Sequence, residues 1–399
     1  MFTSVRVTNF GSIGDTQEMT FGIGQKDILD DSSRVTGNEA VNLISCIVGH
    51  NASGKTMILK ALTFLLFFVN NSYSRKPEKI LVDAHKFRAN EPTKIEVEFI
   101  SNSKLFKYSI ELTKEEVISE YFGQKVVRGF TRIFEYTRKD NGWTFKSSNL
   151  AINPNDLKRF EERKHASVLS GLLQLSYLES ITLFENRYSN VTRFGFAGPN
   201  TSNASLLRTS FALSSDDALR QDALLFSREI DLGINSFAFR DIDAAKDVIG
   251  EDSKKQLLEC IHKSRVGEFS LDLIEESNGT QQSIILISRI IPILNSGGIV
   301  IIDEIESGLH PFVAKKIVSL FDNKKTNPMN SQLIFSTHLP WLLNDRTKTQ
   351  IFIAEKDNET FETEIFRLDE IEGVRNDENY FTKYLAGAYG GTGNINFFL

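Results

Sequence analysis

The sequence has few cysteines and lacks the features of secreted or membrane-spanning chains. Its two cysteines, Cys46 and Cys260, do not form a C-x-x-C pair, which favours reduced, buried thiols. The N-terminal stretch MFTSVRVTNF lacks the basic and then apolar layout of a secretion signal. The longest apolar run, Ala61 to Val69, is much shorter than the roughly 20 residues of a membrane span. We therefore expect a cytoplasmic protein with no membrane partner.

The sequence also lacks a positive net charge. Its formal net charge is −6 and its isoelectric point is near 5.7. Proteins dedicated to nucleic acids are more often basic, so this balance disfavours obligate DNA binding, although a local basic groove stays open. No heptad pattern persists over several repeats, which disfavours a long coiled coil. Tryptophan is scarce, with 2 residues, whereas 31 phenylalanines indicate a phenylalanine-rich core with some exposed aromatic surface.

What the sequence does contain is the phosphate-binding pattern G-x-x-x-x-G-K-S/T. Its residues are Gly49, His50, Asn51, Ala52, Ser53, Gly54, Lys55 and Thr56. A short apolar strand, 44–48, precedes them, and an apolar helix, 57–69, follows, which is the context that the motif requires. We expect the loop N–H groups and the helix N-terminus to bind nucleotide phosphates. Lys55 would reach the β and γ phosphates, and Thr56 would offer its hydroxyl to Mg²⁺.

A second acidic motif lies far along the chain. The apolar strand Ile299–Ile302 ends in Asp303 and Glu304. We expect Asp303 to help hold Mg²⁺ and Glu304 to position and polarise the attacking water. The distance from Lys55 to Asp303 is too long for a small GTPase or a kinase. The nearest match to the guanine motif N-K-x-D, at 323–326, lacks the aspartate, so guanine specificity is not expected.

Two polar segments flank this acidic strand. Upstream, Ser277 and Gly279 open an apolar segment, 283–294, which we interpret as a helix although its isoleucines leave a strand open. A serine and a glycine at a helix N-terminus form a second candidate anion site. Downstream, His338 follows the buried strand 332–335. We expect His338 to contact the γ phosphate and to sense its presence.

The remaining pattern predicts an α/β fold. Alternating apolar residues from 94 to 146 predict an antiparallel β region with a hairpin turn at 140–142. Helical spacing covers 155–184 and 216–228, and the polar residues 189–215 are interpreted as an exposed loop. The C-terminal third returns to alternating strands and helices, which predicts a mostly parallel sheet with flanking helices. We divide the chain into an N-terminal ATPase lobe (1–150), a helical insert (151–260) and a C-terminal ATPase lobe (261–399).

The order of these motifs resembles the ABC-type ATPases of the RecF, SMC and overcoming-lysogenization-defect group. The likeness rests on G-x-x-x-x-G-K-T, S-x-G-T-Q, a strand ending D-E, E-S-G-L-H-P and S-T-H, and it covers most of 1–100 and 262–399. More narrowly, the chain is similar to compact AAA-type ATP-binding proteins of bacterial abortive-infection and anti-phage operons, such as AriA of the PARIS system and the RloA-like proteins. Asp231–Ile234, Ser277–Pro311 and Tyr384–Gly391 carry that narrower likeness.

The resemblance implies a head that works as a homodimer or higher homo-oligomer. Two heads would sandwich ATP between Gly49–Thr56 of one copy and Ser277–Gly279 of the other. ATP binding would close the sandwich, and slow or regulated hydrolysis through Glu304 would open it. The chain has Ser-Asn-Gly where many relatives have Ser-Gly-Gly, and it has Ala388 where an arginine is expected.

Two functions fit this resemblance. The first is an ATP-driven switch or scaffold that holds a separate effector, such as a Toprim-like nuclease, and releases it on a phage protein or DNA signal. Residues 351–357 resemble the opening of a Toprim domain, but the residues after Asp357 supply no D-x-D pair, so the nuclease would be a separate partner. The alternative is a RecF-like DNA clamp in repair. Its candidate phosphate contacts are Lys125, Arg128, Arg132, Arg138 and Lys139, for which a solvated strand face is the simpler interpretation.

Overall fold

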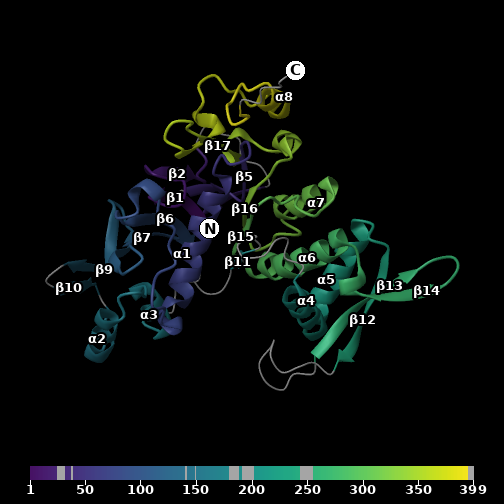
Figure 1. Cartoon of the computed structure of the whole chain (residues 1–399), viewed down its shortest axis with the longest axis horizontal. Coiled ribbons are helices and arrows are strands. Elements are labelled where there is room, and N and C mark those ends of the chain that lie inside the picture. The colour runs from purple at the N-terminus through teal and green to yellow at the C-terminus, as the bar shows by residue number, and fades with distance from the viewer. Residues whose placement is uncertain are drawn as a thin grey trace. The chain divides into compact units, whose positions relative to one another are not determined.

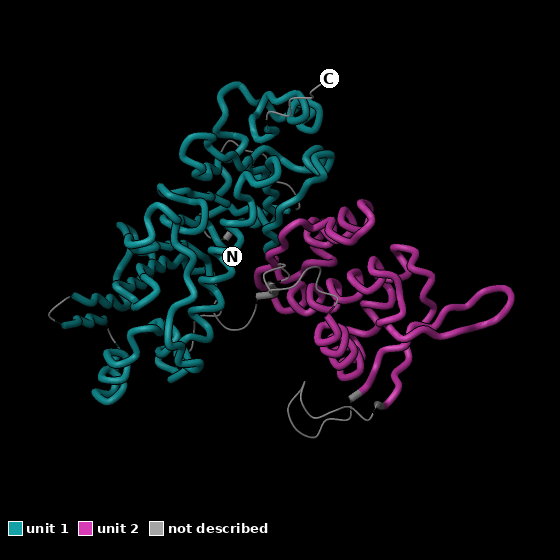
Figure 2. The backbone as a smooth tube through the Cα atoms, viewed as in Figure 1, with its two compact units in different colours: residues 1–188, 332–399 teal, residues 189–331 magenta. Residues whose placement is uncertain are grey.

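The computed structural model describes residues 1–24, 32–36, 39–139, 142–148, 150–178, 188–190, 202–242 and 255–393. Figure 1 shows a mixed α/β chain, which confirms the predicted fold class. The chain forms two compact units: unit 1 comprises residues 1–188 and 332–399, and unit 2 comprises residues 189–331 (Figure 2). The three-part division predicted from the sequence stays a prediction.

Unit 1 contains a seven-stranded sheet with the order β10-β9-β8-β7-β6-β1-β2. Its neighbouring strands pair antiparallel among the described residues, as predicted for the region from 94 to 146. The predicted hairpin is confirmed by the pairing of β9 with β10, whereas its turn residues 140 and 141 lie outside the described residues. The strands are β1 (Phe2–Thr8), β2 (Gln17–Thr20), β6 (Thr93–Ser101), β7 (Lys104–Leu112), β8 (Val117–Lys125), β9 (Phe130–Lys139) and β10 (Gly142–Ser147).

Phenylalanines form a continuous ladder across five strands of this sheet. Phe99 stacks on Phe106 with ring centroids 5.6 Å apart, and Phe106 stacks on Phe122 at the same distance. Phe134 continues the series 6.0 Å from Phe122, and Phe145 lies 5.9 Å beyond it. Cross-strand aromatic pairs stabilise a sheet beyond their buried area. The high phenylalanine content therefore has a structural use in the core of unit 1.

A second sheet of unit 1 positions the phosphate-binding loop. Its strands β16, β5, β17 and β18 are neighbours in that order. The central strand β5 is buried at every residue and pairs in parallel with β16 and β17, while β18 pairs antiparallel with β17. The strands are β5 (Ile44–Val48), β16 (Gln332–Ser336), β17 (Ile351–Lys356) and β18 (Thr363–Arg367). A separate antiparallel pair joins β3 (Ser33–Thr36) to β4 (Glu39–Asn42).

Helix α1 (Lys55–Arg75) is the long helix that follows the loop. By length and composition it is a candidate membrane span, the one found among the described residues, but 56% of the candidate window is buried inside the protein. The core helix of a soluble protein passes the same test. Its buried side includes Leu62, Leu65 and Leu66, each 0% exposed. This burial explains why the predicted helix is apolar nearly all round.

Helix α3 is tied to the sheet by a buried carboxylate. Glu120 on β8 is 1% exposed and accepts hydrogen bonds from the backbone N–H groups of Val168 (2.6 Å) and Leu169 (3.2 Å). Its Oε2 also accepts from Tyr108 Oη (2.9 Å) and Ser167 Oγ (3.0 Å). Two helices occupy the region predicted as helical from 155: α2 (Pro154–Glu162) and α3 (Val168–Gln174), while residues 179–187 lie outside the described part.

Unit 2 corrects two expectations about the middle of the chain. Residues 202–215, expected as part of a loop, contain helix α4, which Ser202 caps by accepting from the Ser205 N–H. The helix buries Leu206 and Leu213 on one side, so packing overrides a polar composition. The insert also contains strands that were not predicted, β12 and β13. The elements are α4 (Asn203–Ser215), α5 (Asp217–Glu229), β12 (Ile234–Ile242), β13 (Lys255–Lys263), β14 (Glu268–Asp272), α6 (Asn278–Ser296), β15 (Ile299–Ile302) and α7 (Pro311–Asp322).

The isoleucine-rich segment left open between helix and strand is a helix. Helix α6 is buried along almost its whole length, including Ile284, Ile287 and Ile290. Strand β15 follows it after Gly297, whose φ of +80° ends the helix. Helix α6 and strand β15 are both buried and rich in isoleucine, so apolar composition does not distinguish them. Their lengths do.

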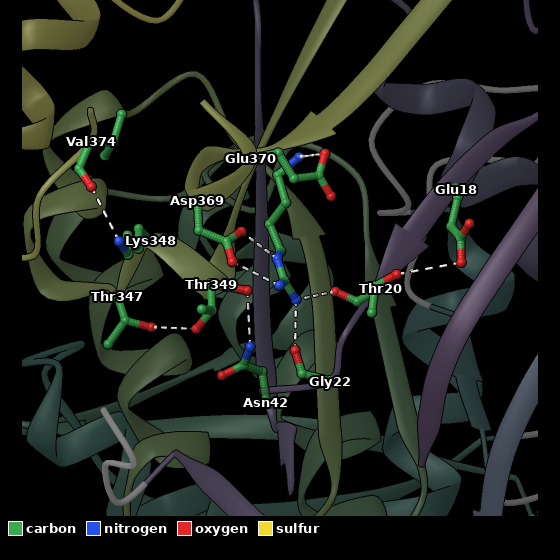
Figure 3. Close-up of polar contacts among 11 residues, drawn as sticks. Glu18, Thr20, Gly22, Asn42, Thr347, Lys348, Thr349, Asp369, Glu370 and Val374 are labelled. Atoms are coloured by element: carbon green, nitrogen blue, oxygen red, sulfur yellow. Dashed lines mark hydrogen bonds and ion pairs between the residues drawn. The ribbon is translucent and has the colours of Figure 1, made fainter. Parts of the chain in front are cut away.

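In unit 1, the side chain of Arg367, the last residue of β18, donates four hydrogen bonds, which we call the Arg367 clamp. Its Nη1 donates to the carbonyl oxygens of Thr20 and Gly22, both at 2.7 Å. Its Nε and Nη2 bind the two oxygens of Asp369 at 2.5 and 2.8 Å. Figure 3 shows Thr20, Gly22 and Asp369 around this contact, with Asn42 bonded to Thr349 close by. Both charged side chains are largely buried, at 11% and 15% exposed.

We expect Arg367→Ala to lower the free energy of unfolding by about 3 kcal/mol, because it leaves Asp369 and two carbonyls without their donor. Arg367→Lys should recover less than half of that loss, since an ammonium cannot make the bidentate contact. Arg375→Ala is the control, because Arg375 forms an exposed ion pair with Asp377 and should cost under about 0.5 kcal/mol. Urea unfolding measures all three, and similar losses for Arg367→Ala and Arg375→Ala would contradict the clamp.

Candidate nucleotide-binding site

The predicted phosphate-binding loop lies between a buried strand and a long helix. It leaves β5 after Val48 and enters α1 at Lys55, as the motif requires. Gly54 caps α1 with a φ of +101°, and Ala52 has a positive φ of +64°. The first N–H groups of an α-helix have no partner within the helix, and they favour anions. The loop therefore presents a helix N-terminus in the position where phosphate binds in such motifs.

Close packing requires two of the loop glycines. A Cβ atom on Gly49 would lie 2.3 Å from the carbonyl oxygen of Ala354 on β17. A Cβ atom on Gly54 would lie 1.9 Å from Thr363 Oγ1 on β18. The same Thr363 hydroxyl donates to the Ser53 carbonyl oxygen at 3.2 Å. Strands β17 and β18 therefore fix the shape of the loop, and a larger residue at either glycine would displace it.

Lys55 is folded back onto the loop that precedes it. Its Nζ donates to the carbonyl oxygens of Gly49 (2.7 Å) and His50 (2.9 Å), and the residue is 5% exposed. His50 Nδ1 lies 2.6 Å from the Asn51 carbonyl oxygen, so this nitrogen carries a proton. The Ser53 N–H closes the turn on the His50 carbonyl oxygen at 3.2 Å. The loop thus encloses a positive charge where anionic phosphates are expected.

A cavity of about 1410 Å³ opens beside this loop within unit 1. Gly49, His50 and Asn51 contribute to its lining, and so do His338 and Glu355. Residues of the glycine-rich C-terminal segment complete the wall. Small-molecule sites are typically 300 to 1,000 Å³, so the space is ample for a nucleotide.

His338 reaches the cavity from the strand beside the loop. Thr337 continues the parallel pairing of β16 with β5, because its N–H donates to the Ile47 carbonyl oxygen at 3.1 Å. Thr337 is 1% exposed, whereas His338, one residue on, is exposed. The carboxyl ends of parallel neighbours meet at one edge of a sheet. The structure therefore brings His338 and the start of the loop to the same cavity, and its contact with a γ phosphate stays a prediction.

The signature residues lie in unit 2 at the start of α6. Ser277 caps the helix: its Oγ accepts from the Thr280 N–H at 3.2 Å and lies 2.9 Å from Thr280 Oγ1. A Cβ atom on Gly279 would meet the Gly308 carbonyl oxygen at 3.5 Å, an ordinary contact. Oε1 of Glu276, one residue before the cap, accepts a hydrogen bond from His262 Nε2 at 2.7 Å. Ser277 thus has a structural role as a cap, and its predicted role toward ATP stays a prediction.

The two carboxylates stand at the end of β15 in unit 2. Asp303 is 7% exposed, and Glu304 is less buried. Glu304 has a φ of +50°, a conformation uncommon for a residue with a side chain. Its carbonyl oxygen accepts from the Ser307 N–H at 2.8 Å, which fixes the turn. This turn fixes the direction in which the Glu304 side chain leaves the backbone, and its catalytic role stays a prediction.

The predicted site residues are divided between the two units. Gly49–Thr56 and His338 belong to unit 1, whereas Ser277, Gly279, Asp303 and Glu304 belong to unit 2. Each group is described within its own unit, and its assigned role stays a prediction. Sequence reasoning did not single out Thr363, which holds the loop, or Glu355 as part of the site. Thr363 belongs to no recognisable motif and Glu355 only to the Toprim-like stretch 351–357, so their places beside the loop and the cavity emerge only from the folded contacts.

Comparisons with known proteins bear on this site. The family model described as "AAA domain, putative AbiEii toxin, Type IV TA system" matches residues 44–344. A curated relative, "Retron Vc95 probable ATPase" of Vibrio cholerae serotype O1 biovar El Tor, is 24% identical over 368 residues, which cover 78% of this chain and 68% of the relative. The family match begins in β5 and ends after His338, so it includes every predicted site residue.

Two solved structures of SMC heads are also similar. The SMC head domain from Thermotoga maritima is 12% identical and has a TM-score of 0.42, with 92% of this chain and 98% of that chain covered. An SMC head bound to the C-winged helix domain of ScpA is 12% identical and has a TM-score of 0.45, with 92% and 99% covered.

Proposed function

Since the chain belongs to the AAA domain family whose description names an AbiEii toxin of a type IV toxin–antitoxin system, we propose that it binds and hydrolyses ATP as the switch or scaffold subunit of an anti-phage system. The observation that carries the ATP proposal is the loop itself. It places Lys55 at the N-terminus of α1, inside a turn fixed by β17 and β18, next to the cavity that His338 also lines.

Phosphate binding follows from the local charge. The N-terminal end of α1 and the Lys55 ammonium both favour an anion at the loop. Thr56 offers a hydroxyl and Asp303 a carboxylate, and hard oxygen donors of this kind suit Mg²⁺. Bound Mg²⁺ would neutralise phosphate charge. Glu304 would then orient water toward the γ phosphate, and His338 would contact that phosphate.

The dimeric arrangement is part of the proposal. Gly49–Thr56 of one copy would bind ATP together with Ser277 and Gly279 of a second copy, as the resemblance to ABC-type heads implies. The bound nucleotide would then stabilise the closed homodimer, and hydrolysis would release it. The helix start at Ser277 supports this, because a capped N-terminus on a buried helix is a rigid platform for a phosphate.

A separate effector is the finer part of the proposal. The family description refers to a toxin–antitoxin system, and the curated relative is a retron ATPase. Both names support the anti-phage role that the sequence resemblance implies. We propose that the closed assembly holds an effector of another chain, such as a Toprim-like nuclease, in the cytoplasm and that a phage protein or DNA triggers release.

No observation favours the DNA-clamp alternative. Two of the candidate basic residues are engaged with carboxylates: Arg132 with Glu135 at 3.1 Å, and Arg138 with Glu116 at 3.6 Å. Lys125 lies over the Phe130 ring at 5.1 Å. Such contacts describe a solvated strand face more than a phosphate-binding track.

Glu304→Gln is expected to lower ATP turnover about 100-fold while ATP binding stays within about twofold, because the amide cannot polarise water as a carboxylate does. Glu268→Gln on the exposed face of β14 makes the same charge change and should turn over like the wild type. Phosphate release measures turnover, and calorimetric titration measures binding. Unchanged turnover in Glu304→Gln would remove the catalytic assignment.

The same variant tests the switch. With ATP, Glu304→Gln should accumulate as a closed homo-oligomer in size-exclusion chromatography, and it should retain a co-expressed effector such as a Toprim-like nuclease. If the ATP-locked variant instead binds DNA in a salt-sensitive manner and retains no protein partner, the clamp is the better description.

A further inference from the structure

The C-terminal segment folds back onto the phosphate-binding loop. We call residues 379–393 the C-terminal hook; it comprises the short helix α8 (Tyr380–Leu385) and the glycine-rich turn after it. The Cβ position of Gly391 lies 3.6 Å from Gly49 Cα, and that of Gly393 lies 3.2 Å from His50 Cβ. Both glycines have φ near +70°, which residues with side chains rarely adopt. The approach of hook to loop is therefore specific to glycine.

A carboxylate and a phenol hold the hook in place. Glu355, at the end of β17, accepts a hydrogen bond from the Gly391 N–H. The Tyr384 hydroxyl donates to the Gly391 carbonyl oxygen at 3.0 Å. Burial, with the nearby Cys46 and Glu355, raises the pKa of Tyr384 to about 12, so the phenol keeps its proton and remains a donor. Gly391 is thus bonded on both sides.

The hook is also joined to the segment that follows His338. The Phe381 N–H, in the first turn of α8, donates to Asn344 Oδ1 at 3.0 Å. Asn344 belongs to the short 3₁₀ helix η3 (Pro340–Asp345), which begins two residues after His338. One C-terminal element therefore contacts both the loop and the segment that carries His338.

The hook lines the same cavity as these residues. Gly387, Gly390, Gly391 and Gly393 all contribute to its wall, together with Gly49 and His338. A wall of glycines lets the backbone of the hook approach a bound nucleotide without obstruction from side chains. The phosphate-binding loop and the C-terminal hook therefore line one cavity.

We propose that the C-terminal hook is a wall of the nucleotide site and that Glu355 is the positioning residue that holds it against Gly49. This inference rests on the proposed ATP site. Glu355 acts through Gly391, so its side chain must offer an acceptor to the Gly391 N–H. Glutamine keeps such an acceptor and alanine does not, which separates positioning from direct contact with nucleotide or metal.

The test measures binding of a fluorescent ATP analogue with Mg²⁺ to the full chain. Glu355→Ala is expected to lower the affinity about tenfold, and Glu355→Gln should stay within about twofold of the wild type. Glu359→Ala removes an exposed carboxylate just beyond β17 and serves as the matched control. Amide hydrogen exchange should be faster at 384–393 in Glu355→Ala but not in Glu355→Gln.

Tyr384→Phe provides a second route if Glu355→Ala does not fold. It removes one hydroxyl, keeps the buried ring, and should lower the affinity about threefold. Equal affinity in Glu355→Ala, Tyr384→Phe and the wild type would overturn the inference. A Glu355→Gln variant as weak as Glu355→Ala would overturn the positioning role.

The proposed ATP site fails in a distinguishable way. Lys55→Ala in the same assay should bind no analogue. If Lys55→Ala loses binding while both hook variants bind normally, the ATP site stands and the inference about the hook is wrong. If the wild type itself binds no analogue, the proposed ATP binding is wrong, and the hook has no nucleotide to enclose.

Discussion

Lys55→Ala is expected to lower the affinity for ATP about 1000-fold, or roughly 4 kcal/mol, and to abolish turnover. In the structure, the ammonium sits inside the turn and bonds the carbonyl oxygens of Gly49 and His50. Alanine removes the only full positive charge of the motif and leaves those carbonyls in a phosphate site. Loss of a charged partner in a buried position has larger effects than loss of a surface contact.

The control for this prediction is Lys79→Ala, which removes the same charge at an exposed ion pair with Glu115. It should leave ATP affinity unchanged. Calorimetric titration compares the two variants, and urea unfolding checks that Lys55→Ala loses no more than about 2 kcal/mol of stability. If the two variants bind ATP equally well, this loop is not the nucleotide site.

Local patterns predicted the parts of the fold that depend on neighbouring residues. The strand before the loop, the helix after it and the acidic strand β15 were all found, because the apolar run and its polar end are contiguous. Helix α4 was interpreted as a loop. Its buried Ser210 explains why: the hydroxyl donates to the Leu206 carbonyl oxygen and accepts from the Leu258 N–H on β13. That second partner lies 48 residues away in the chain.

Prediction from the sequence has the same limit at the candidate site. Lys55 and His338 could be predicted because each lies in a motif at the end of a buried strand. Thr363 could not, because its contact with the Ser53 carbonyl joins residues 310 apart. Glu355 is part of the Toprim-like stretch 351–357, but its bond to Gly391 depends on the return of the C-terminal hook. Contacts set by long-range packing leave no periodic signal in the sequence.

Glu120→Ala is expected to lower the free energy of unfolding by about 4 kcal/mol. The buried carboxyl group accepts four hydrogen bonds between β8 and the first turn of α3. Alanine would leave two backbone N–H groups and two hydroxyls without an acceptor, and it would leave a cavity. Glu120→Gln keeps one acceptor and the volume, so we expect a loss of only about 1–2 kcal/mol. Glu115→Ala on the exposed turn before β8 should cost under about 0.5 kcal/mol.

The protonation of Glu120 determines how the free energy of unfolding changes with pH. Burial raises the pKa of Glu120 from the ordinary 4.5 to about 7, against the opposing effect of its four donors. Between these two values the folded chain binds a proton that the unfolded chain has released, so stability is greatest at low pH and falls as pH rises toward 7. The shift corresponds to about 3 kcal/mol.

Glu120→Gln isolates that proton from every other titrating group. An amide does not ionise, so the variant should lose this part of the pH dependence and keep the rest. We therefore expect the stability of the wild type minus that of Glu120→Gln to fall as pH rises from 5 to 8, measured by urea unfolding at each pH. A difference that stays constant over this range would mean that the four donors outweigh burial and keep Glu120 ionised, because a folded pKa below the ordinary 4.5 would confine this pH dependence to more acidic conditions.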